Sequence, residues 1–425
     1  MNVPRPDPVT PYDRLAWTDN EIEALLVSGA RRRELVAVFG AELYAELCML
    51  AETARRVGAS SGPRLWLVPG IMGSRLGRSR ANGESADTIW LDPVDIIAGR
   101  LTELHVRAEL PVASLGILHF SYLRLKLALA AAGYAVRSFD YDWRCGVREL
   151  GARFGDYLRR DGRDCIIVAH SMGGLVARCA LKSSGVPALH RLVLLGTPNN
   201  GSWASVQALR GTYSVVRRLA QLDLSHDAKF LAAEVFHGFQ CLYDLLPGVA
   251  SGDCRLLASD AWPAGGLRPD PERLRAATAV SALLLAADQR FTCVAGFGVP
   301  TVIAAQDQGQ FVYTISTAGD GTVAAAAATL PGARCYFARS SHSQLTRGAQ
   351  IADAIIDIVR SGATRLLPDS EKLTTQNWRL SEAQLWALAH EKLDWAAMSV
   401  DARRLFLDTL NEPVPAPGAK SAPLR

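Results

Sequence analysis

The chain has 425 residues and a mass of 45.8 kDa. Hydrophobic residues make up 49% and charged residues 21%, a composition that excludes a disordered chain and a coiled coil. The formal net charge of +4 is small and spread along the chain, so we expect no nucleic-acid partner.

The beginning of the chain carries no targeting signal that we recognise. The first ten residues contain three prolines and no apolar run, unlike a secretory signal. No stretch approaches the roughly 18 consecutive apolar residues of a membrane span. The eight cysteines are scattered without a Cys-x-x-Cys pair, which argues for reduced thiols and against a zinc site. We therefore expect a cytoplasmic protein that needs no metal.

Residues 1–62 form a predicted helical extension. Thr18 and Glu21 have the spacing of a capping box and precede apolar residues at helical intervals, beginning with Ile22. The sequence Ser60-Ser61-Gly62-Pro63 ends this pattern.

Residues 63–362 alternate short strands with helices. The predicted strands cover 64–69, 135–141, 164–169, 191–195, 292–297, 311–316 and 334–338, and the predicted helices cover 120–132, 150–160, 172–181 and 349–360. The segments 164–169 and 191–195 are almost continuously apolar, which is typical of parallel strands buried on both faces. This alternation predicts an α/β fold with a mostly parallel, doubly wound sheet.

Two segments depart from this alternation. Residues 201–290 combine amphipathic pieces with a stretch rich in glycine and proline, and we interpret them as a cap or lid inserted over the sheet. Residues 363–425 form a predicted helical tail, in which Ser381 and Gln384 make a second capping box. The tail ends in a proline-rich segment, 412–425, that we expect to be disordered.

The strongest local signal is the sequence Ala169-His170-Ser171-Met172-Gly173-Gly174, between a predicted buried strand and a predicted helix. A nucleophile elbow needs this context, with small residues two positions to either side of a strained serine. Ala169 and Gly173 meet that need. The backbone N–H of Met172, at the helix start, is a candidate oxyanion donor. The alternative is an ordinary glycine-rich turn without chemistry.

A nucleophilic serine needs a base and an acid that orients the base, and on this architecture they follow in the order serine, acid, histidine. His342 follows the last predicted strand of the sheet, and Asp320 precedes it by 22 residues within Gly-Asp-Gly. Asp288 and Asp307 are the alternative acids, and the Gly-Asp-Gly stretch could be a simple surface turn. His170 is aimed away from the hydroxyl by its position beside Ser171, so we assign it a supporting role.

The second oxyanion donor should lie in the loop after an early strand. Residues 68–74 (VPGIMGS) fit that position, and the N–H of Ile71 is the candidate donor. A plain β-turn would also explain the glycines. No organic cofactor is implied by any of these residues.

Six stretches together resemble the lecithin:cholesterol acyltransferase family of α/β-hydrolases, in a bacterial form. They are 67–74 (LVPGIMGS), 89–92 (IWLD), 141–144 (YDWR), the serine elbow, 319–323 (GDGTV) and 342–343 (HS), in the order of the family. The resemblance implies an α/β-hydrolase fold, Ser171 as nucleophile, Asp320 and His342 as its partners, and Ile71 and Met172 as oxyanion donors. Extracellular members carry a secretion signal and a lid disulfide that have no clear counterpart here.

The residues and the resemblance suggest a serine-dependent hydrolase or O-acyltransferase of lipid esters, in peripheral contact with membranes. An amidase, a peptidase or another carboxylesterase would share the same chemistry, and a non-enzymatic interaction scaffold is a third possibility. The apolar residues of the insertion either line an acyl pocket or pack the cap; they are Val215, Val216, Leu219, Leu222, Leu231, Phe236 and Phe239. The sequence does not decide the substrate, the acyl acceptor or the oligomeric state.

Overall fold

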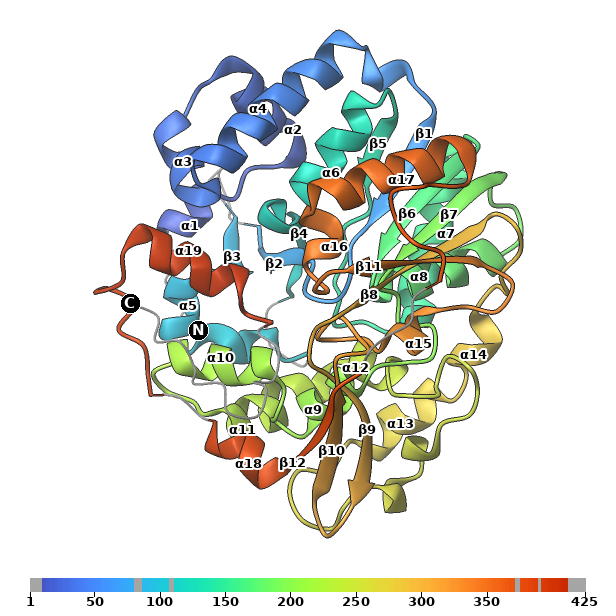
Figure 1. Ribbon diagram of the computed structural model, residues 1–425. Coiled ribbons are helices and arrows are strands. Elements are labelled where there is room, and N and C mark those ends of the chain that lie inside the picture. The colour runs from blue at the N-terminus through green and yellow to red at the C-terminus, as the bar shows by residue number, and fades with distance from the viewer. Residues whose placement is uncertain (1–9, 80–85, 107–110, 371–374, 389–390, 412–425) are drawn as a thin grey trace.

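The structure is a computed structural model that describes residues 10–79, 86–106, 111–370, 375–388 and 391–411 (Figure 1). At its centre is a six-stranded sheet in the order β11-β8-β7-β6-β1-β5, in which every neighbouring pair is parallel. Its strands are β1 (Arg64–Val68), β5 (Ala135–Ser138), β6 (Cys165–His170), β7 (Leu189–Leu195), β8 (Phe291–Phe297) and β11 (Arg334–Arg339). The chain therefore has the α/β-hydrolase fold that the sequence predicts.

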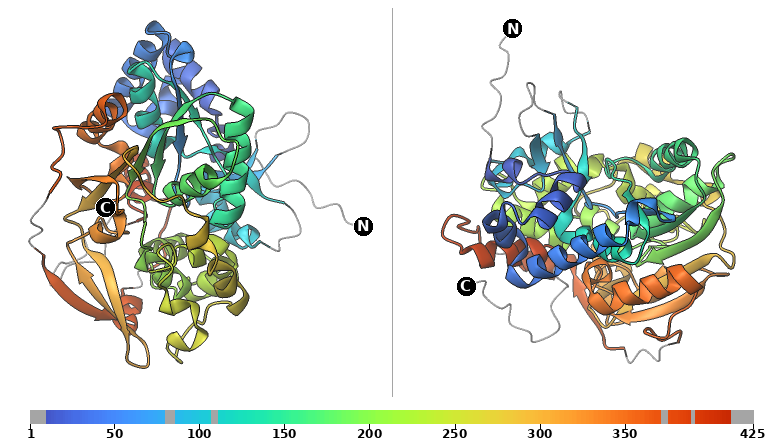
Figure 2. Two further views of the ribbon diagram at one scale, coloured as in Figure 1. Left: turned by 90° about the vertical axis from the view of Figure 1, so that its right-hand side faces the viewer. Right: turned by 90° about the horizontal axis from the view of Figure 1, so that it is seen from above.

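Helices cover both faces of this sheet because the side chains of each strand alternate between two cores. Trp66 and Ile167 pack on one face with α7 (Val147–Asp161) and α8 (Met172–Lys182). Leu65 and Val168 pack on the other face with α6 (His119–Ala131) and α17 (Ala349–Ser361). Figure 2 shows α17 and α7 on opposite sides of the sheet.

The N-terminal helices pack against α6. They are α1 (Pro11–Arg14), α2 (Asp19–Ser28), α3 (Arg32–Phe39) and α4 (Ala41–Arg56). The capping box of Thr18 and Glu21 is present at the start of α2, as predicted. Leu47 of α4 joins Leu123 and Leu127 of α6 in one buried cluster, so these helices bury an apolar face against the sheet's own helix layer.

Two small antiparallel sheets were not predicted as such. The first, in the order β3-β2-β4, consists of β2 (Ser74–Arg78), β3 (Asp87–Trp90) and β4 (Ala113–Ile117). The second, in the order β12-β10-β9, consists of β9 (Thr301–Asp307), β10 (Phe311–Ser316) and β12 (Asn377–Ser381). The strand predicted at 311–316 is thus confirmed, but it lies outside the parallel sheet. The tail contributes a strand as well as helices.

The segment 201–290 is helical and lies beside the carboxyl ends of the sheet strands (Figure 1). Its helices are α9 (Trp203–Leu209), α10 (Ser214–Leu222), α11 (Ala228–Phe230), α12 (Gln240–Asp244), α13 (Pro271–Ala277) and α14 (Val280–Leu283). The remaining α-helices are α5 (Pro93–Ile97), α15 (Ala325–Ala328), α16 (Gln344–Arg347), α18 (Glu382–Ala387) and α19 (Val400–Asp408).

Within the described ranges, none of the helices has the length and apolarity that crossing a membrane requires. The segment predicted to be disordered, 412–425, lies outside the described residues.

Candidate active site

Ser171 sits in a strained turn between β6 and α8. Its backbone has φ 53° and ψ −130°, a conformation that residues with side chains rarely adopt. A Cβ on Gly173 would lie 2.3 Å from the Pro69 carbonyl oxygen, and one on Gly174 would lie 2.1 Å from Thr197 Oγ1. Only glycine fits at these two positions, as a nucleophile elbow requires.

The structure brings Asp320 and His342 together. His342 Nδ1 lies 2.7 Å from Asp320 Oδ2, and the exposed fractions of the two residues are 7% and 1%. Asp320 Oδ1 accepts the backbone N–H groups of Thr322 (2.9 Å) and Val323 (2.7 Å), and the His342 N–H donates to the Asp320 carbonyl (2.8 Å). The carboxylate is therefore fixed by its own turn, with one oxygen left for the imidazole.

The alternative acids lie elsewhere. Asp288 pairs with Arg290 at 2.5 Å, and the exposed Asp307 accepts the Gly309 N–H at 2.8 Å. Neither carboxylate is in the wall of the pocket that contains Ser171 and His342.

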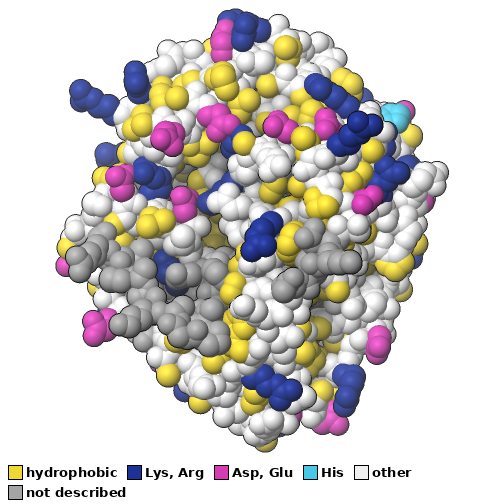
Figure 3. All heavy atoms as spheres, in the orientation of Figure 1, with side chains coloured by type: hydrophobic (Ala, Val, Ile, Leu, Met, Phe, Trp, Pro, Cys, Tyr) yellow, Lys and Arg dark blue, Asp and Glu magenta, His cyan; other side chains and the backbone are white. Residues whose placement is uncertain are grey.

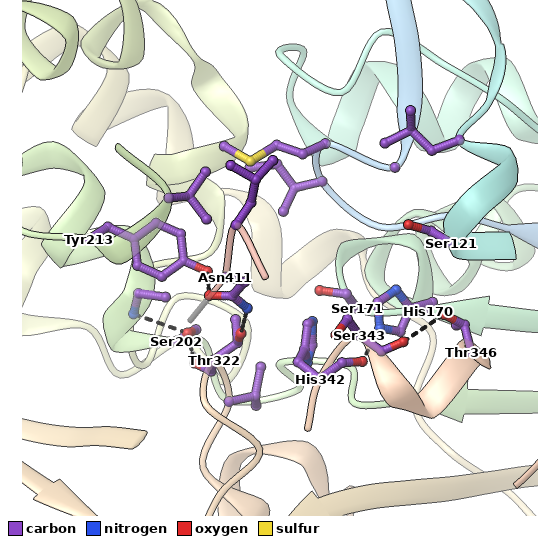
Figure 4. A pocket seen from close by; sticks show the side chains of 18 of the residues that line it. Ser121, His170, Ser171, Ser202, Tyr213, Thr322, His342, Ser343, Thr346 and Asn411 are labelled. Atoms are coloured by element: carbon purple, nitrogen blue, oxygen red, sulfur yellow. Dashed lines mark hydrogen bonds between the residues drawn. The ribbon is translucent and has the colours of Figure 1, made fainter. Parts of the chain in front are cut away.

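Ser171 and His342 face the same pocket, as Figure 4 shows. Among the described residues, the Ser171 hydroxyl makes no hydrogen bond with the imidazole. Nucleophile–base hydrogen bonds are often long without substrate and shorten when the substrate binds. The arrangement brings together a buried serine at a helix start, a histidine and a buried carboxylate in the order that acyl transfer needs.

The loop after β1 closes over the serine. A Cβ on Gly70 would lie 2.7 Å from Ser171 Cβ, so the backbone approaches as closely as glycine allows. The Ile71 and Met172 N–H groups make no hydrogen bond with any residue that the structure describes. Both are free to donate to an oxyanion beside Ser171.

Side chains from two of the motif stretches hold this loop in place. Tyr141 donates its hydroxyl to the Pro69 carbonyl (2.5 Å), and Trp143 Nε1 donates to the Ser74 carbonyl (3.0 Å). Trp90 Nε1 donates to the Met72 carbonyl (3.0 Å). Side chains of the IWLD and YDWR stretches therefore position the loop.

His170 links the oxyanion loop to the loop of His342. The Gly70 N–H donates to the Tyr122 hydroxyl (2.9 Å), which donates to His170 Nδ1 (2.9 Å). His170 Nε2 then donates to the His342 carbonyl (3.1 Å). Burial, with a smaller effect of His342, holds the His170 pKa well below its usual value, so the ring is neutral, as these bonds require. The sequence predicted support from His170 but gave no sign of Tyr122.

The pocket in front of Ser171 is small and mostly apolar. Its volume is about 160 Å³, and its apolar walls include Met72, Trp90, Leu118, Phe120, Leu242 and Leu245. Figure 3 shows this face hollowed between α19 and α16. Of the apolar insertion residues that the sequence offered as an acyl pocket, only Val215 lines it; the others pack the cap.

The end of the described chain forms one wall of the pocket, which sequence patterns did not reveal. Asn411 Nδ2 donates to Thr322 Oγ1 (2.6 Å), and Tyr213 donates its hydroxyl to Asn411 Oδ1 (2.8 Å; Figure 4). Asp408 pairs with Arg347 at 3.2 Å. The tail is therefore tied to the loop of the candidate acid and to the helix that follows the candidate histidine.

A family model described as Lecithin:cholesterol acyltransferase matches residues 121–264. Over those residues the chain is similar to that family. This confirms the resemblance seen in the motifs and supports, in general terms, a hydrolase or acyltransferase of lipid esters. The matched part of the chain contains Ser171 and ends before Asp320 and His342.

Solved structures give weaker likenesses. The lipase BlEst2 of Bacillus licheniformis in its propeptide form has 16% identity and a TM-score of 0.39; the match covers 70% of this chain but only 50% of that one. Its mature form has 15% identity and a TM-score of 0.37 over 70% and 92% of the two chains. The Tle4–Tli4 complex has 14% identity and a TM-score of 0.34 over 56% and 75%. At these values the likenesses bear on neither substrate nor activity. No curated protein sequence matches the chain.

Proposed function

We propose that the chain is a serine-dependent hydrolase or O-acyltransferase of lipid esters, with Ser171 as nucleophile, His342 as base and Asp320 as the residue that orients the base. The observation that carries this proposal is the buried 2.7 Å contact between His342 Nδ1 and Asp320 Oδ2 beside a serine strained at φ 53°. Backbone strain of this kind costs free energy and is found mainly at functional sites, so it favours a catalytic turn over an ordinary one.

In the proposed reaction, Ser171 Oγ attacks the ester carbonyl while His342 Nε2 takes its proton. The carbonyl oxygen becomes an oxyanion that accepts hydrogen bonds from the Ile71 and Met172 N–H groups. His342 returns the proton to the departing alcohol, and an acyl-enzyme forms. Water or a second alcohol then attacks the acyl-enzyme, with His342 again as base, and restores Ser171.

The apolar lining of the pocket supports a lipid ester as the substrate rather than a polar ester. Its lining is mainly aliphatic and aromatic, and burial of an acyl chain there gains about 0.8 kcal/mol for each methylene removed from water. Peripheral contact with a membrane follows from such a substrate and is part of the proposal.

The first experiment treats the full chain with a fluorophosphonate and measures the intact mass. We expect one adduct on the wild type and none on Ser171→Ala. Ser121→Ala is the matched control, because Ser121 lines the same pocket and should leave the adduct in place. A folded wild type that stays unlabelled, also with detergent or lipid present, would support the scaffold alternative instead.

A second measurement compares long-chain esters with amides of the same acyl group, with and without acceptor alcohols. Faster cleavage of the esters supports the lipid-ester proposal. Preferential cleavage of the amides would establish the amidase alternative. The ratio of transferred to hydrolysed product separates an acyltransferase from a hydrolase.

A further inference from the structure

Two cysteines lie opposite each other on neighbouring strands of the central sheet. Cys293 of β8 and Cys335 of β11 are paired in register, and both side chains pack in the core on the same face of the sheet. Neighbouring strands lie about 4.8 Å apart, and disulfides join Cα atoms that are about 4.4–6.8 Å apart. The two thiols, which are free in this structure, therefore lie within the range of a disulfide.

The two sulfur atoms share their surroundings. The Cys293 thiol donates a hydrogen bond to Cys335, and the Leu330 N–H lies against both sulfur atoms. Cys293 Sγ also accepts a hydrogen bond from Asn199 Nδ2 at 3.9 Å. The Cys335 thiol has a weak contact with the Ala333 carbonyl oxygen at 3.8 Å. These contacts hold the sulfur atoms beside each other and surround them with hydrogen-bond donors.

A buried guanidinium belongs to the same cluster. Arg178 of α8 is 5% exposed; its Nε donates to the Leu285 carbonyl (3.0 Å) and its Nη1 to Asn199 Oδ1 (3.0 Å). It forms no salt bridge in the part of the chain that the structure describes. Burial lowers the pKa of Arg178 to about 10, and the charge of Cys293 opposes that shift. Cysteines beside an arginine are typically reactive, because the cation stabilises the thiolate.

The reactive thiolate forms on Cys335. The hydrogen bond from Cys293 lowers the pKa of Cys335, and the Leu330 N–H lowers it as well, whereas burial acts in the opposite direction. Cys335 is half-buried on the edge strand of the sheet, whereas Cys293 is fully buried, so an oxidant from solvent meets Cys335 first.

Other cysteines lack this environment. Burial raises the pKa of five of them, which keeps the thiols protonated and unreactive; they are Cys145, Cys165, Cys179, Cys241 and Cys254.

We propose that Cys293 and Cys335 are a redox pair that hydrogen peroxide converts reversibly to a disulfide. The Cys335 thiolate attacks the peroxide, so that an S–O bond forms, the O–O bond breaks and hydroxide leaves. The Cys293 sulfur then attacks the sulfenic acid on Cys335 and gives up its thiol proton. An S–S bond forms, the S–O bond breaks and water leaves. In total two thiols are oxidised to one disulfide, and one peroxide is reduced to two molecules of water. A dithiol reductant restores both thiols.

The disulfide would link the two strands that lead to the candidate acid and base. Near the end of β8, a Cβ on Gly296 would lie 2.6 Å from Asp320 Cβ, and β11 ends at Arg339, shortly before His342. Oxidation therefore joins the two sides of the proposed triad and leaves Ser171 untouched. The redox pair and the proposed function can fail separately, because the disulfide is detected by mass and not by activity.

The experiment treats the reduced full-length protein with hydrogen peroxide, unfolds it, alkylates the remaining thiols and measures the mass. We expect the wild type to lose two of its eight thiols, and a peptide map to link Cys293 to Cys335. Dithiothreitol should restore all eight. Cys335→Ser should lose no thiol at the same peroxide concentration. Cys293→Ser should stop at the sulfenic acid of Cys335, which dimedone traps.

Cys241→Ser is the matched control, because Cys241 is as fully buried as Cys293 and packs in the same core. It should form the same disulfide as the wild type. If Cys293→Ser does not fold, Cys335→Ser decides the matter alone, since its position on the edge strand is half-buried. The proposal is overturned if the wild type keeps eight thiols under conditions that oxidise glutathione completely. Disulfides that persist in Cys335→Ser would overturn it equally.

Discussion

Replacing Asp320 by asparagine separates the two tasks of this side chain. In the native turn Oδ1 accepts the Thr322 and Val323 N–H groups, and Oδ2 faces His342 Nδ1 at 2.7 Å. Asparagine has the same shape, and its carbonyl can keep both backbone bonds. Its NH₂ group then faces Nδ1, which must accept a hydrogen bond and therefore carries no proton.

The consequence is a change of tautomer at His342. With Nδ1 unprotonated, the neutral ring carries its proton on Nε2 and cannot take one from Ser171. A serine enzyme with this defect loses about 10⁴-fold in kcat, which corresponds to about 5 kcal/mol of transition-state stabilisation. The free energy of unfolding should change little, because no buried donor or acceptor loses its partner.

The assay measures initial rates of p-nitrophenyl ester hydrolysis and the rate of fluorophosphonate labelling. Asp288→Asn and Asp307→Asn make the same chemical change at the alternative acids, and both should stay within about twofold of the wild type because neither lines the pocket. The assignment is refuted if a folded Asp320→Asn protein keeps more than a tenth of the activity. A large loss in Asp288→Asn or Asp307→Asn would refute it equally.

Three further predictions concern the surroundings of the serine. Tyr122→Phe removes the hydroxyl between Gly70 and His170 and should slow ester hydrolysis roughly tenfold with KM nearly unchanged; an unaltered kcat would remove Tyr122 from the positioning network. Gly174→Ala places a Cβ 2.1 Å from a threonine oxygen and should cost about 1–3 kcal/mol in urea unfolding, whereas Gly155→Ala, whose nearest contact is 3.4 Å, should be neutral or stabilising. Because burial depresses the His170 pKa, the native state binds fewer protons than the unfolded state, and stability declines as pH falls below about 6.5. The Tm of the wild type should therefore drop more between pH 7.5 and pH 5 than that of His170→Gln, and parallel drops would contradict this account.

The parallel sheet and the serine turn could be predicted because their signals are local. Segment 164–169 is apolar on both faces, because helices cover the strand on both sides. The two glycines after Met172 stand where a Cβ would collide with neighbouring atoms, so only glycine fits there. The pairing of His342 with Asp320 was reached from chain order, and the geometry agrees with it.

The features that escaped prediction depend on contacts distant in sequence. The strand at 311–316 has the same alternation in either kind of sheet, and only its pairing with residues 301–307 and 377–381 decides which sheet it joins. Tyr122 sits within a helix whose leucines dominate the pattern, so its hydroxyl bond to His170 leaves no trace in the sequence. Asn411 reaches the pocket only because the tail folds back across the molecule.

The strand β12 has a consequence for the order in which the molecule can assemble. Residues 377–381 complete the sheet of β9 and β10, and the next residue, Glu382, neutralises Arg210, whose side chain is 1% exposed. Until that part of the chain leaves the ribosome, Arg210 has no carboxylate and the edge of β10 has no neighbour. A chain that ended before residue 377 would therefore have an unpaired edge on β10, open to aggregation. The pocket wall is complete only once residue 411 has also been made.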